Sequence, residues 1–319
     1  MIYFYNTFHN GDVHYSRTFV RDIMTKIGNL DYRNYLGGYI SGSDYVNDYC
    51  YLHNNNPQIL KDFPTLKHDN SFSQFDNWQL VSKYPISYYD QIIYNNDNLY
   101  INTWVGQQNW ITRNGVDRNR NDRYCSLYSH YELYEDIFYK LGIPIEKIDY
   151  YLPVIDFNLI EKDNIDNFIS KSNFDLKILI VNNFPLTMRI QIDMNHVADY
   201  LSDKYPNILF ILTKKSEIIK DNIAYTNDII KLDCDLNEIS YLSTFCDIIV
   251  GRPSGPFTFC VIKDNFIKNK TFITISDNTY DRFYFESEAD MLLLTEHTPN
   301  ALISMLENKI KEYDTKNFS

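Results

Sequence analysis

LNEISYLSTFCDIIVGRPSGPFTFCV, residues 236–261, holds the alternation of helix and strand that decides the fold. Its first part has an apolar residue at every third position, which predicts a helix over 236–245 with one apolar face. Asp235 or Asn237 would supply the N-cap of this helix. The β-branched run 247–250 ends at Gly251 and predicts a parallel strand buried on both faces. A strand of this kind belongs to an open α/β sheet.

A turn of small residues follows this strand and opens a second helix, which is predicted from residue 256. Ser254, Gly255 and Thr258 leave the first backbone N–H groups of that helix unobstructed. Such a helix start attracts a diphosphate through its orphan donors and its dipole, and open α/β sheets place ligands at the carboxyl ends of strands. The residues alone leave two interpretations open, a phosphate cradle or a tight strand-to-helix turn with a good cap.

A second strand–turn–helix unit begins the chain. Ile2–Tyr5 is a compact apolar strand, and the polar turn from His9 to Asp12 follows it. Apolar residues at helical spacing then run to Gly28, which predicts a helix that ends there. Asp12 falls at the N-cap, where free N–H groups and the helix dipole stabilise a carboxylate. A helix cap and a catalytic base are both compatible with this position.

Two stretches carry a resemblance to a known family. FHNGDVHYSRTFVRDI, residues 8–23, resembles the N-terminal GD-V motif of the ADP-heptose:lipopolysaccharide heptosyltransferases, and DLNEISYLSTFCDIIVGRPSGPFTF, residues 235–259, resembles their donor-site segment. The resemblance implies the α/β fold called GT-B, in which two Rossmann-like domains with parallel sheets face each other and a C-terminal helix crosses back to the first domain. It implies that the first domain binds mainly the acceptor and the second mainly the nucleotide sugar.

The resemblance also assigns roles to single residues. Asp12 matches the catalytic base of the family, and Ser254 and Gly255 match the pair that contacts phosphate. The acceptor side would include His9, Asn10, Gly11 and His14. The donor side would include Asn183, Glu217, Arg252, Ser254, Gly255, Pro256 and Thr258, with Glu217 near the ribose.

The implied reaction moves a sugar from a nucleotide diphosphate sugar to a hydroxyl of a glycan or glycolipid, with inversion. Asp12 would take the acceptor proton while the helix start stabilises the departing diphosphate, so that neither a metal nor another cofactor is required. Pro253 and Thr258 stand where the family has Asp and His. Two other functions stay open: a non-catalytic relative that binds a glycan or a partner, and an epimerase that acts on the nucleotide sugar itself.

Composition and charge narrow the classes of function. The chain has 319 residues and a formal net charge of -12, which opposes tight nonspecific binding to nucleic acid. The arginines between residues 113 and 123 alternate with Asn and Asp and form the one basic cluster, for which an anionic acceptor is one interpretation. No signal peptide and no apolar run of roughly 18 residues is visible. We therefore expect a cytoplasmic protein, with peripheral membrane association and oligomeric state left open.

The cysteines and histidines predict no metal site. The 5 cysteines are odd in number and lack C-x-x-C spacing, which argues against a disulfide framework or a zinc site. The 7 histidines form neither an H-x-x-x-H nor an H-E-x-x-H pattern. Asp233-Cys234-Asp235 has the spelling of a metal-binding D-x-D motif, but a cap for the following helix is the simpler interpretation.

The pattern of the sequence changes near residue 155. We expect an N-terminal acceptor-side domain over 1–155 and a C-terminal nucleotide-sugar domain over 156–319, joined by a charged linker with a short helix over 153–173. Strands that alternate with helices predict a parallel sheet in the second domain. Its predicted strands are 178–181, 208–212, 229–232, 247–250 and 271–275, and its predicted helices are 190–204, 236–245, one from 256 and an amphipathic one over 298–313. The first domain has a predicted strand at 99–104 and a predicted helix over 130–141 that ends at Gly142.

Overall fold

The computed structural model of the protein divides into two compact units, made mainly of residues 1–160 and of residues 161–319. We call them unit 1 and unit 2. The division falls within the segment 153–173 that is predicted as a linker. The structure describes residues 2–5, 14, 92–95, 98–102, 139, 142, 152–155, 157–183, 191–230, 236–268, 270–276 and 290–317.

Unit 1 contains a mixed sheet of three strands in the order β1-β3-β2. β1 (Ile2–Tyr5) runs parallel to β3 (Asn98–Asn102), and β2 (Ile92–Asn95) runs antiparallel to β3. The strands predicted at 2–5 and 99–104 are confirmed, whereas β2 had no predicted counterpart.

The helices predicted in unit 1 fall almost entirely outside the described residues. Of the helix over 130–141, Tyr139 is described and is helical. Gly142 has φ +68° and its N–H donates to the Tyr139 carbonyl at 3.0 Å. This left-handed conformation is typical of the residue that ends a helix, as predicted for Gly142.

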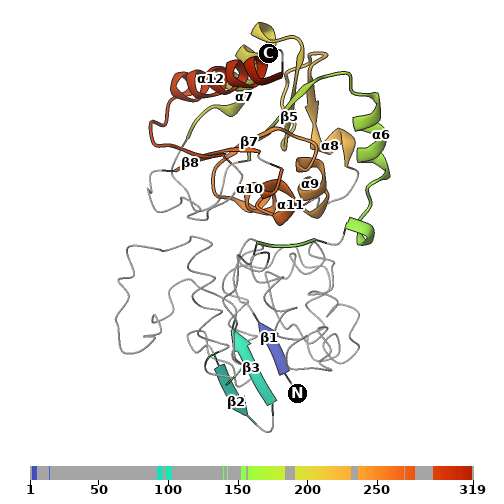
Figure 1. Ribbon diagram of the computed structural model, residues 1–319, viewed down its shortest axis with the longest axis vertical. Coiled ribbons are helices and arrows are strands. Elements are labelled where there is room, and N and C mark those ends of the chain that lie inside the picture. The colour runs from blue at the N-terminus through green and yellow to red at the C-terminus, as the bar shows by residue number, and fades with distance from the viewer. Residues whose placement is uncertain are drawn as a thin grey trace. The chain divides into compact units, whose positions relative to one another are not determined.

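Unit 2 is built on a six-stranded sheet in the order β6-β5-β4-β7-β8-β9, in which every neighbouring pair is parallel. This is the strand order of the doubly wound Rossmann fold, so the α/β class and the parallel sheet predicted for this half are confirmed. Figure 1 labels β5, β7 and β8 of this sheet. The strands are β4 (Leu176–Val181), β5 (Ile208–Leu212), β6 (Ile223–Tyr225), β7 (Ile248–Gly251), β8 (Thr271–Ile275) and β9 (Asp290–Leu294).

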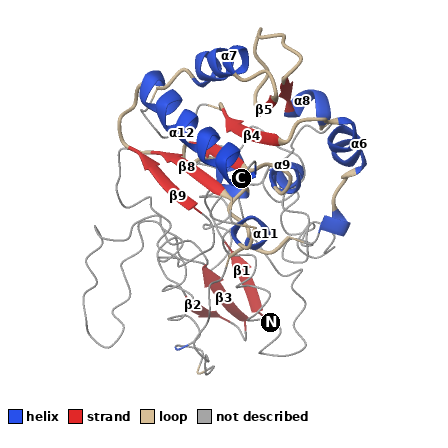
Figure 2. Cartoon of the chain, turned by 45° about the horizontal axis from the view of Figure 1, so that its top comes forward, coloured by secondary structure: helices blue, strands red, loops and turns tan. Residues whose placement is uncertain are grey.

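Both faces of this sheet are buried. Ile178 and Ile180 of β4 belong to one apolar core together with α7 (Met194–Lys204) and α12 (Pro299–Asn317), which Figure 2 shows above the strands. Leu179 lies between them on the strand, faces the opposite side because side chains alternate, and is also fully buried. Burial on two faces explains why the strands of this unit are continuous apolar runs.

The second face of the sheet is covered by α10 (Gly255–Phe259), which contacts β7 and packs on α9 (Leu236–Ser243). α9 is more deeply buried than its sequence indicates, since Asn237, Glu238 and Ser240 are buried along with the apolar residues. The Ser240 hydroxyl lies 2.6 Å from the Phe259 carbonyl and accounts for part of that burial. Asn237 is the second residue of the helix, so it is not the N-cap.

One predicted element of unit 2 differs from the structure. Of the strand predicted at 229–232, Ile229 is helical and Ile230 is in no strand, while residues 231 and 232 lie outside the described residues. β6 lies earlier, and α8 (Thr226–Ile229) follows it directly, closed by a hydrogen bond from the Ile230 N–H to the Thr226 carbonyl. The helix predicted from 256 is confirmed as α10, which is five residues long. Its C-cap, Cys260, donates its N–H to the Phe257 carbonyl at 3.0 Å, and α11 (Lys263–Phe266) follows.

The ends of unit 2 agree better with the prediction. The linker segment contains a 3₁₀ turn, η5 (Phe157–Leu159), and α6 (Asp163–Lys171). The C-terminal amphipathic helix is confirmed as α12, with Leu302, Leu306 and Ile310 in the core of unit 2. The apolar face of α12 is used within unit 2, and its crossing to the first domain stays a prediction.

Candidate functional site

The candidate site lies where the strand order of unit 2 reverses, at the carboxyl ends of β4 and β7. In open α/β sheets the helices on either side of such a point leave opposite faces, which opens a crevice for ligands. β4 ends at Val181 and is followed by Asn182 and Asn183, while β7 ends at Gly251 and is followed by Arg252 and the Ser254–Gly255 turn. The fold therefore brings together two segments of the predicted donor side, 69 or more residues apart in the chain.

The turn after β7 contains a buried polar atom without a partner. Ser254 is the N-cap of α10 in an extended conformation, yet its side chain makes no capping bond. Its Oγ is buried and has no hydrogen-bond partner. A buried unsatisfied hydroxyl costs free energy, and no hydrogen bond among the described residues offsets this cost at Ser254.

Packing explains why position 251 is a glycine but does not explain why position 255 is one. A Cβ on Gly251 would lie 2.7 Å from Phe257 Cδ2 and 2.8 Å from Val181 Cβ, so packing excludes any side chain there. A Cβ on Gly255 would meet only Leu236 Cδ2, at an ordinary 3.8 Å. The fold requires Gly251 but does not require Gly255, and the open space above Gly255 is consistent with close approach of a ligand. Pro256 is at the first turn of α10, and Thr258 is buried within it.

The buried side chain of Arg252 holds backbone segments next to the site. Its side chain is fully buried, and its two terminal nitrogens donate to the carbonyls of Asn183 at 3.4 Å and Ile192 at 2.7 Å. Burial lowers the pKa of its guanidinium. The sequence placed Arg252 among phosphate-binding residues, but the structure uses its guanidinium to hold the carboxyl end of β4 and the approach to α7.

A frame of amide hydrogen bonds joins the carboxyl ends of β4 and β5. Asn182 accepts from the Lys214 N–H at 2.7 Å and donates to the Lys214 carbonyl at 2.8 Å and to Asn195 Oδ1 at 2.8 Å. The Thr213 hydroxyl bonds to the side-chain oxygens of both Asn182 and Asn183. These bonds occupy the amide of Asn182, which therefore holds the site together rather than offering groups to a ligand.

A cavity of about 400 Å³ opens above this frame. Lys214 and Glu217 are exposed at its lining, and neither forms an ion pair among the described residues. The cavity thus contains a lysine ammonium and a glutamate carboxylate that form no ion pair with other described side chains. The lining residues are Asn182, Asn195, Lys214, Lys215, Ser216, Glu217 and Ile218.

The nearby start of α7 is closed to an anion. The Asp193 carboxylate caps it by accepting from the N–H groups of Asn195 at 3.1 Å and His196 at 3.0 Å. A phosphate there would meet a carboxylate that already occupies the donors. Among the described residues at this edge of the sheet, Lys214 and the turn at Ser254 are the remaining candidates for anion binding.

Sequence reasoning found part of this arrangement. Glu217 lies at the cavity, and Ser254 and Gly255 lie at the strand-order reversal, as predicted, but their contact with a nucleotide stays a prediction. Lys214 and Asn195 were missed as lining residues, although Lys214 could have been found from its position just after a predicted strand. The acceptor-side residues His9, Asn10, Gly11 and Asp12 lie outside the described residues, while His14 is buried with Nε2 3.3 Å from the Val261 carbonyl oxygen.

Other features of the described residues do not favour one function over another. They contain no cluster of three or more His, Cys, Asp or Glu that could hold a metal, and no helix among them is long and apolar enough to cross a bilayer. Cys246 and Cys260 are free and buried. Burial raises the pKa of Cys246 to about 12 and also raises that of Cys260, so both thiols are unreactive packing residues.

No protein-family model matches the sequence, and the search of curated proteins gives no match. Among solved structures, the chain is similar to a glycosyl transferase family 9 protein from Veillonella parvula, with 12% identity and a TM-score of 0.45 over 97% of this chain and 89% of that chain. It is also similar to E. coli heptosyltransferase WaaC with ADP-2-deoxy-2-fluoro heptose, with 9% identity and a TM-score of 0.48 over 97% of this chain and 100% of that chain.

Proposed function

We propose that this protein is a heptosyltransferase-like glycosyltransferase with the GT-B architecture. It would transfer a sugar from a nucleotide diphosphate sugar to a hydroxyl of a glycan or glycolipid, with inversion and without a metal ion. The free thiols of Cys246 and Cys260 fit a reducing compartment, and we place the reaction in the cytoplasm.

The observation that carries the proposal is the cavity at the carboxyl edge of the unit 2 sheet. Lys214 offers an ammonium to a diphosphate, and Glu217 offers a carboxylate to sugar hydroxyls. Within the described part of the chain, neither group is in an ion pair. The Ser254 hydroxyl, which has no partner, lies after the neighbouring strand β7. A nucleoside diphosphate combines the two chemistries that these groups recognise.

The chain's own residues would perform the reaction in two parts. On the donor side, Lys214 and the turn at Ser254 would stabilise negative charge as it develops on the departing diphosphate. On the acceptor side, Asp12 would remove the proton of the attacking hydroxyl as a general base. Since cationic and N–H donors would neutralise the leaving group, the scheme requires no divalent metal.

Nucleotide binding tests the proposal directly. The probes are ADP, GDP, UDP and CDP, used in thermal-shift and calorimetric titrations of the full chain with and without EDTA. We expect one of them to bind, and we expect Lys214→Ala to weaken that binding by about tenfold or more because a charge-assisted contact is lost. Lys268→Ala removes an exposed lysine elsewhere in unit 2 and should leave the affinity unchanged.

The outcome separates the proposal from its alternatives. A chain that binds none of the four nucleotides contradicts it. Binding followed by conversion of a nucleotide sugar in the absence of any acceptor would point to an epimerase, whereas binding without turnover on any acceptor would point to a non-catalytic relative.

A further inference from the structure

The segment that carries Glu217 connects β5 to β6 and has open space on both sides. Ser216, Glu217 and Ile218 line the cavity of about 400 Å³ described above and also a second cavity of about 830 Å³. The next residue, Ile219, is 95% exposed. Apolar packing therefore does not hold this segment, and its position depends on polar contacts.

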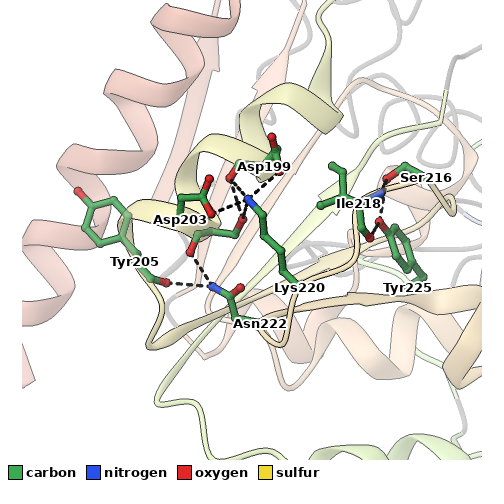
Figure 3. Close-up of polar contacts among 9 residues, drawn as sticks. Asp199, Asp203, Tyr205, Ser216, Ile218, Lys220, Asn222 and Tyr225 are labelled. Carbon is green, nitrogen blue, oxygen red and sulfur yellow. Dashed lines mark hydrogen bonds and ion pairs between the residues drawn. The ribbon is translucent and has the colours of Figure 1, made fainter.

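Polar contacts fix both ends of the segment. At its start, Asn182 brackets Lys214 with two hydrogen bonds. At its end, Lys220 forms ion pairs with Asp199 at 2.6 Å and Asp203 at 2.8 Å (Figure 3). Partial burial lowers the pKa of Lys220, but the hydrogen bonds that its ammonium donates to these two carboxylates outweigh that effect and leave the pKa above its usual value.

Asn222 adds a third anchor to the same helix end. Its side-chain amide donates to the carbonyls of Ser202 at 3.0 Å and Tyr205 at 3.2 Å. Lys220 also donates to the Asp199 carbonyl at 2.8 Å. The segment is thereby fastened to the second half of α7 and to its C-cap, Tyr205.

Side chains of α8 and β6 hold the middle of the segment. Asn227 Oδ1 accepts from the Lys215 N–H at 3.3 Å, and Asp228 forms an ion pair with the Lys215 ammonium at 2.6 Å. The residues on either side of Glu217 are held by Tyr225 of β6. The Tyr225 hydroxyl donates to the Ile218 carbonyl at 2.6 Å and lies 2.7 Å from Ser216 Oγ (Figure 3). Because the phenolic hydrogen is used on Ile218, the Ser216 hydroxyl donates to Tyr225. Tyr225 thus contacts the residue before Glu217 and the residue after it, and it is itself 94% buried, with 6% of its surface exposed.

We infer that Tyr225 is a positioning residue that presents the Glu217 carboxylate to the ribose hydroxyls of the bound nucleoside diphosphate. This inference rests on the proposed function. Glu217 makes no ion pair or hydrogen bond of its own among the described residues, so the contacts of its two neighbours place its backbone. With the backbone fixed, only the exposed side chain of Glu217 has to be ordered on binding, which lowers the entropy cost of binding.

The first test concerns the segment alone and needs no nucleotide. Tyr225→Phe removes one hydroxyl and keeps the buried ring. Hydrogen exchange measured by mass spectrometry on the full chain should show faster exchange over residues 215–219 in this variant. Tyr241→Phe is the matched control, since its hydroxyl bonds to Asp166 on α6 at 2.7 Å, away from the segment. Unchanged exchange over 215–219 in Tyr225→Phe overturns the inference, whatever the protein binds.

The second test connects Tyr225 to Glu217. Calorimetry with whichever of ADP, GDP, UDP and CDP binds the wild type should show about 2- to 10-fold weaker binding for Tyr225→Phe, the loss expected for a hydrogen bond. Glu217→Gln should weaken binding as well, and the double variant should bind as Glu217→Gln does, because Tyr225 acts through Glu217. Losses that add, or an unchanged affinity in Tyr225→Phe, overturn the inference.

The two tests also separate this inference from the function on which it rests. A wild-type chain that binds none of the four nucleotides overturns the proposed function and the ribose role together. Hydrogen exchange still decides in that case whether Tyr225 fixes the segment.

Discussion

Gly251 and Phe257 are packed so closely that a single methyl group on the glycine would overlap the ring, with Cβ 2.7 Å from Cδ2. The contact joins the end of β7 to α10, and Val181 of β4 closes the other side at 2.8 Å. The position of the Ser254–Gly255 turn over the sheet thus depends on a residue without a side chain four positions earlier.

This packing predicts that substitution by alanine destabilises the protein at Gly251 but not at Gly255. Gly251→Ala should lower the free energy of unfolding by about 1–3 kcal/mol, the usual result of overpacking, whereas Gly255→Ala should change it little because the new Cβ meets only Leu236 at 3.8 Å. Urea unfolding of the two variants measures both values. Equal destabilisation by the two substitutions would show that the turn is less open at Gly255 than its geometry indicates.

Gly255→Asp tests the turn as a nucleotide site. The substitution places a carboxylate beside the Ser254 hydroxyl, where the proposed function puts a diphosphate, and we expect it to abolish nucleotide binding by charge repulsion while the fold stays intact. Calorimetric titration gives the affinity, and circular dichroism checks the fold. Gly255→Ala is the control, since it adds a Cβ without charge. Wild-type affinity in Gly255→Asp would remove the turn from the nucleotide site.

Lys270 makes the stability of unit 2 depend on pH in a defined direction. Its ammonium is buried, with 6% of the residue exposed, and donates to the carbonyls of Ser243 and Cys246. Burial lowers its pKa from 10.5 to about 8. Between these two values the unfolded chain binds the proton and the folded chain does not, so the unfolding free energy contributed by Lys270 rises with pH, by up to about 3 kcal/mol.

The comparison of variants isolates this effect from other titrating groups. Wild-type stability, measured relative to Lys270→Met, should increase as the pH rises from 8 towards 10.5. The exposed Lys311 of α12 offers the control, because it is not among the charges that act on Lys270 and Lys311→Met should follow the wild-type pH dependence. A constant difference between wild type and Lys270→Met across this range would mean that Lys270 titrates normally.

The sequence predicted some elements of unit 2 to the residue and missed others for identifiable reasons. β5 and β8 were placed correctly because a strand buried on both faces must be a continuous apolar run. β6 was missed because it has three residues and the apolar pair that follows belongs to a helical turn. The bond from the Lys263 N–H to the Pro153 carbonyl at the start of α11 joins residues 110 positions apart in the chain, and no local pattern reports it.

The residues of the candidate site could likewise be predicted from local patterns but not from long-range contacts. Ser254 and Gly255 could be predicted because a strand, a turn and a helix are adjacent in the chain. The frame that holds Lys214 and Glu217 could not, since its amide and hydroxyl groups come from Asn182, Asn195 and Tyr225 on separate elements. A polar residue in the sequence does not reveal whether its hydrogen bonds go to the protein or to a ligand.

Asp12→Asn tests the catalytic part of the proposal, which concerns a residue outside the described part of unit 1. Asn and Asp cap helices almost equally well, so the variant should keep the stability of the wild type. Asn cannot accept the acceptor's proton, and turnover should fall by roughly 10²–10⁴, the usual loss of a general base. The measurement is the initial rate of sugar transfer, with nucleotide affinity expected to stay unchanged.

Asp193→Asn is the matched control. The Asp193 carboxylate caps α7 through the N–H groups of Asn195 and His196 and has no part in the proposed reaction, so the rate of this variant should equal that of the wild type. A near-normal rate in Asp12→Asn, like that of Asp193→Asn, would mean that Asp12 is a cap as well and that the acceptor proton leaves by another route.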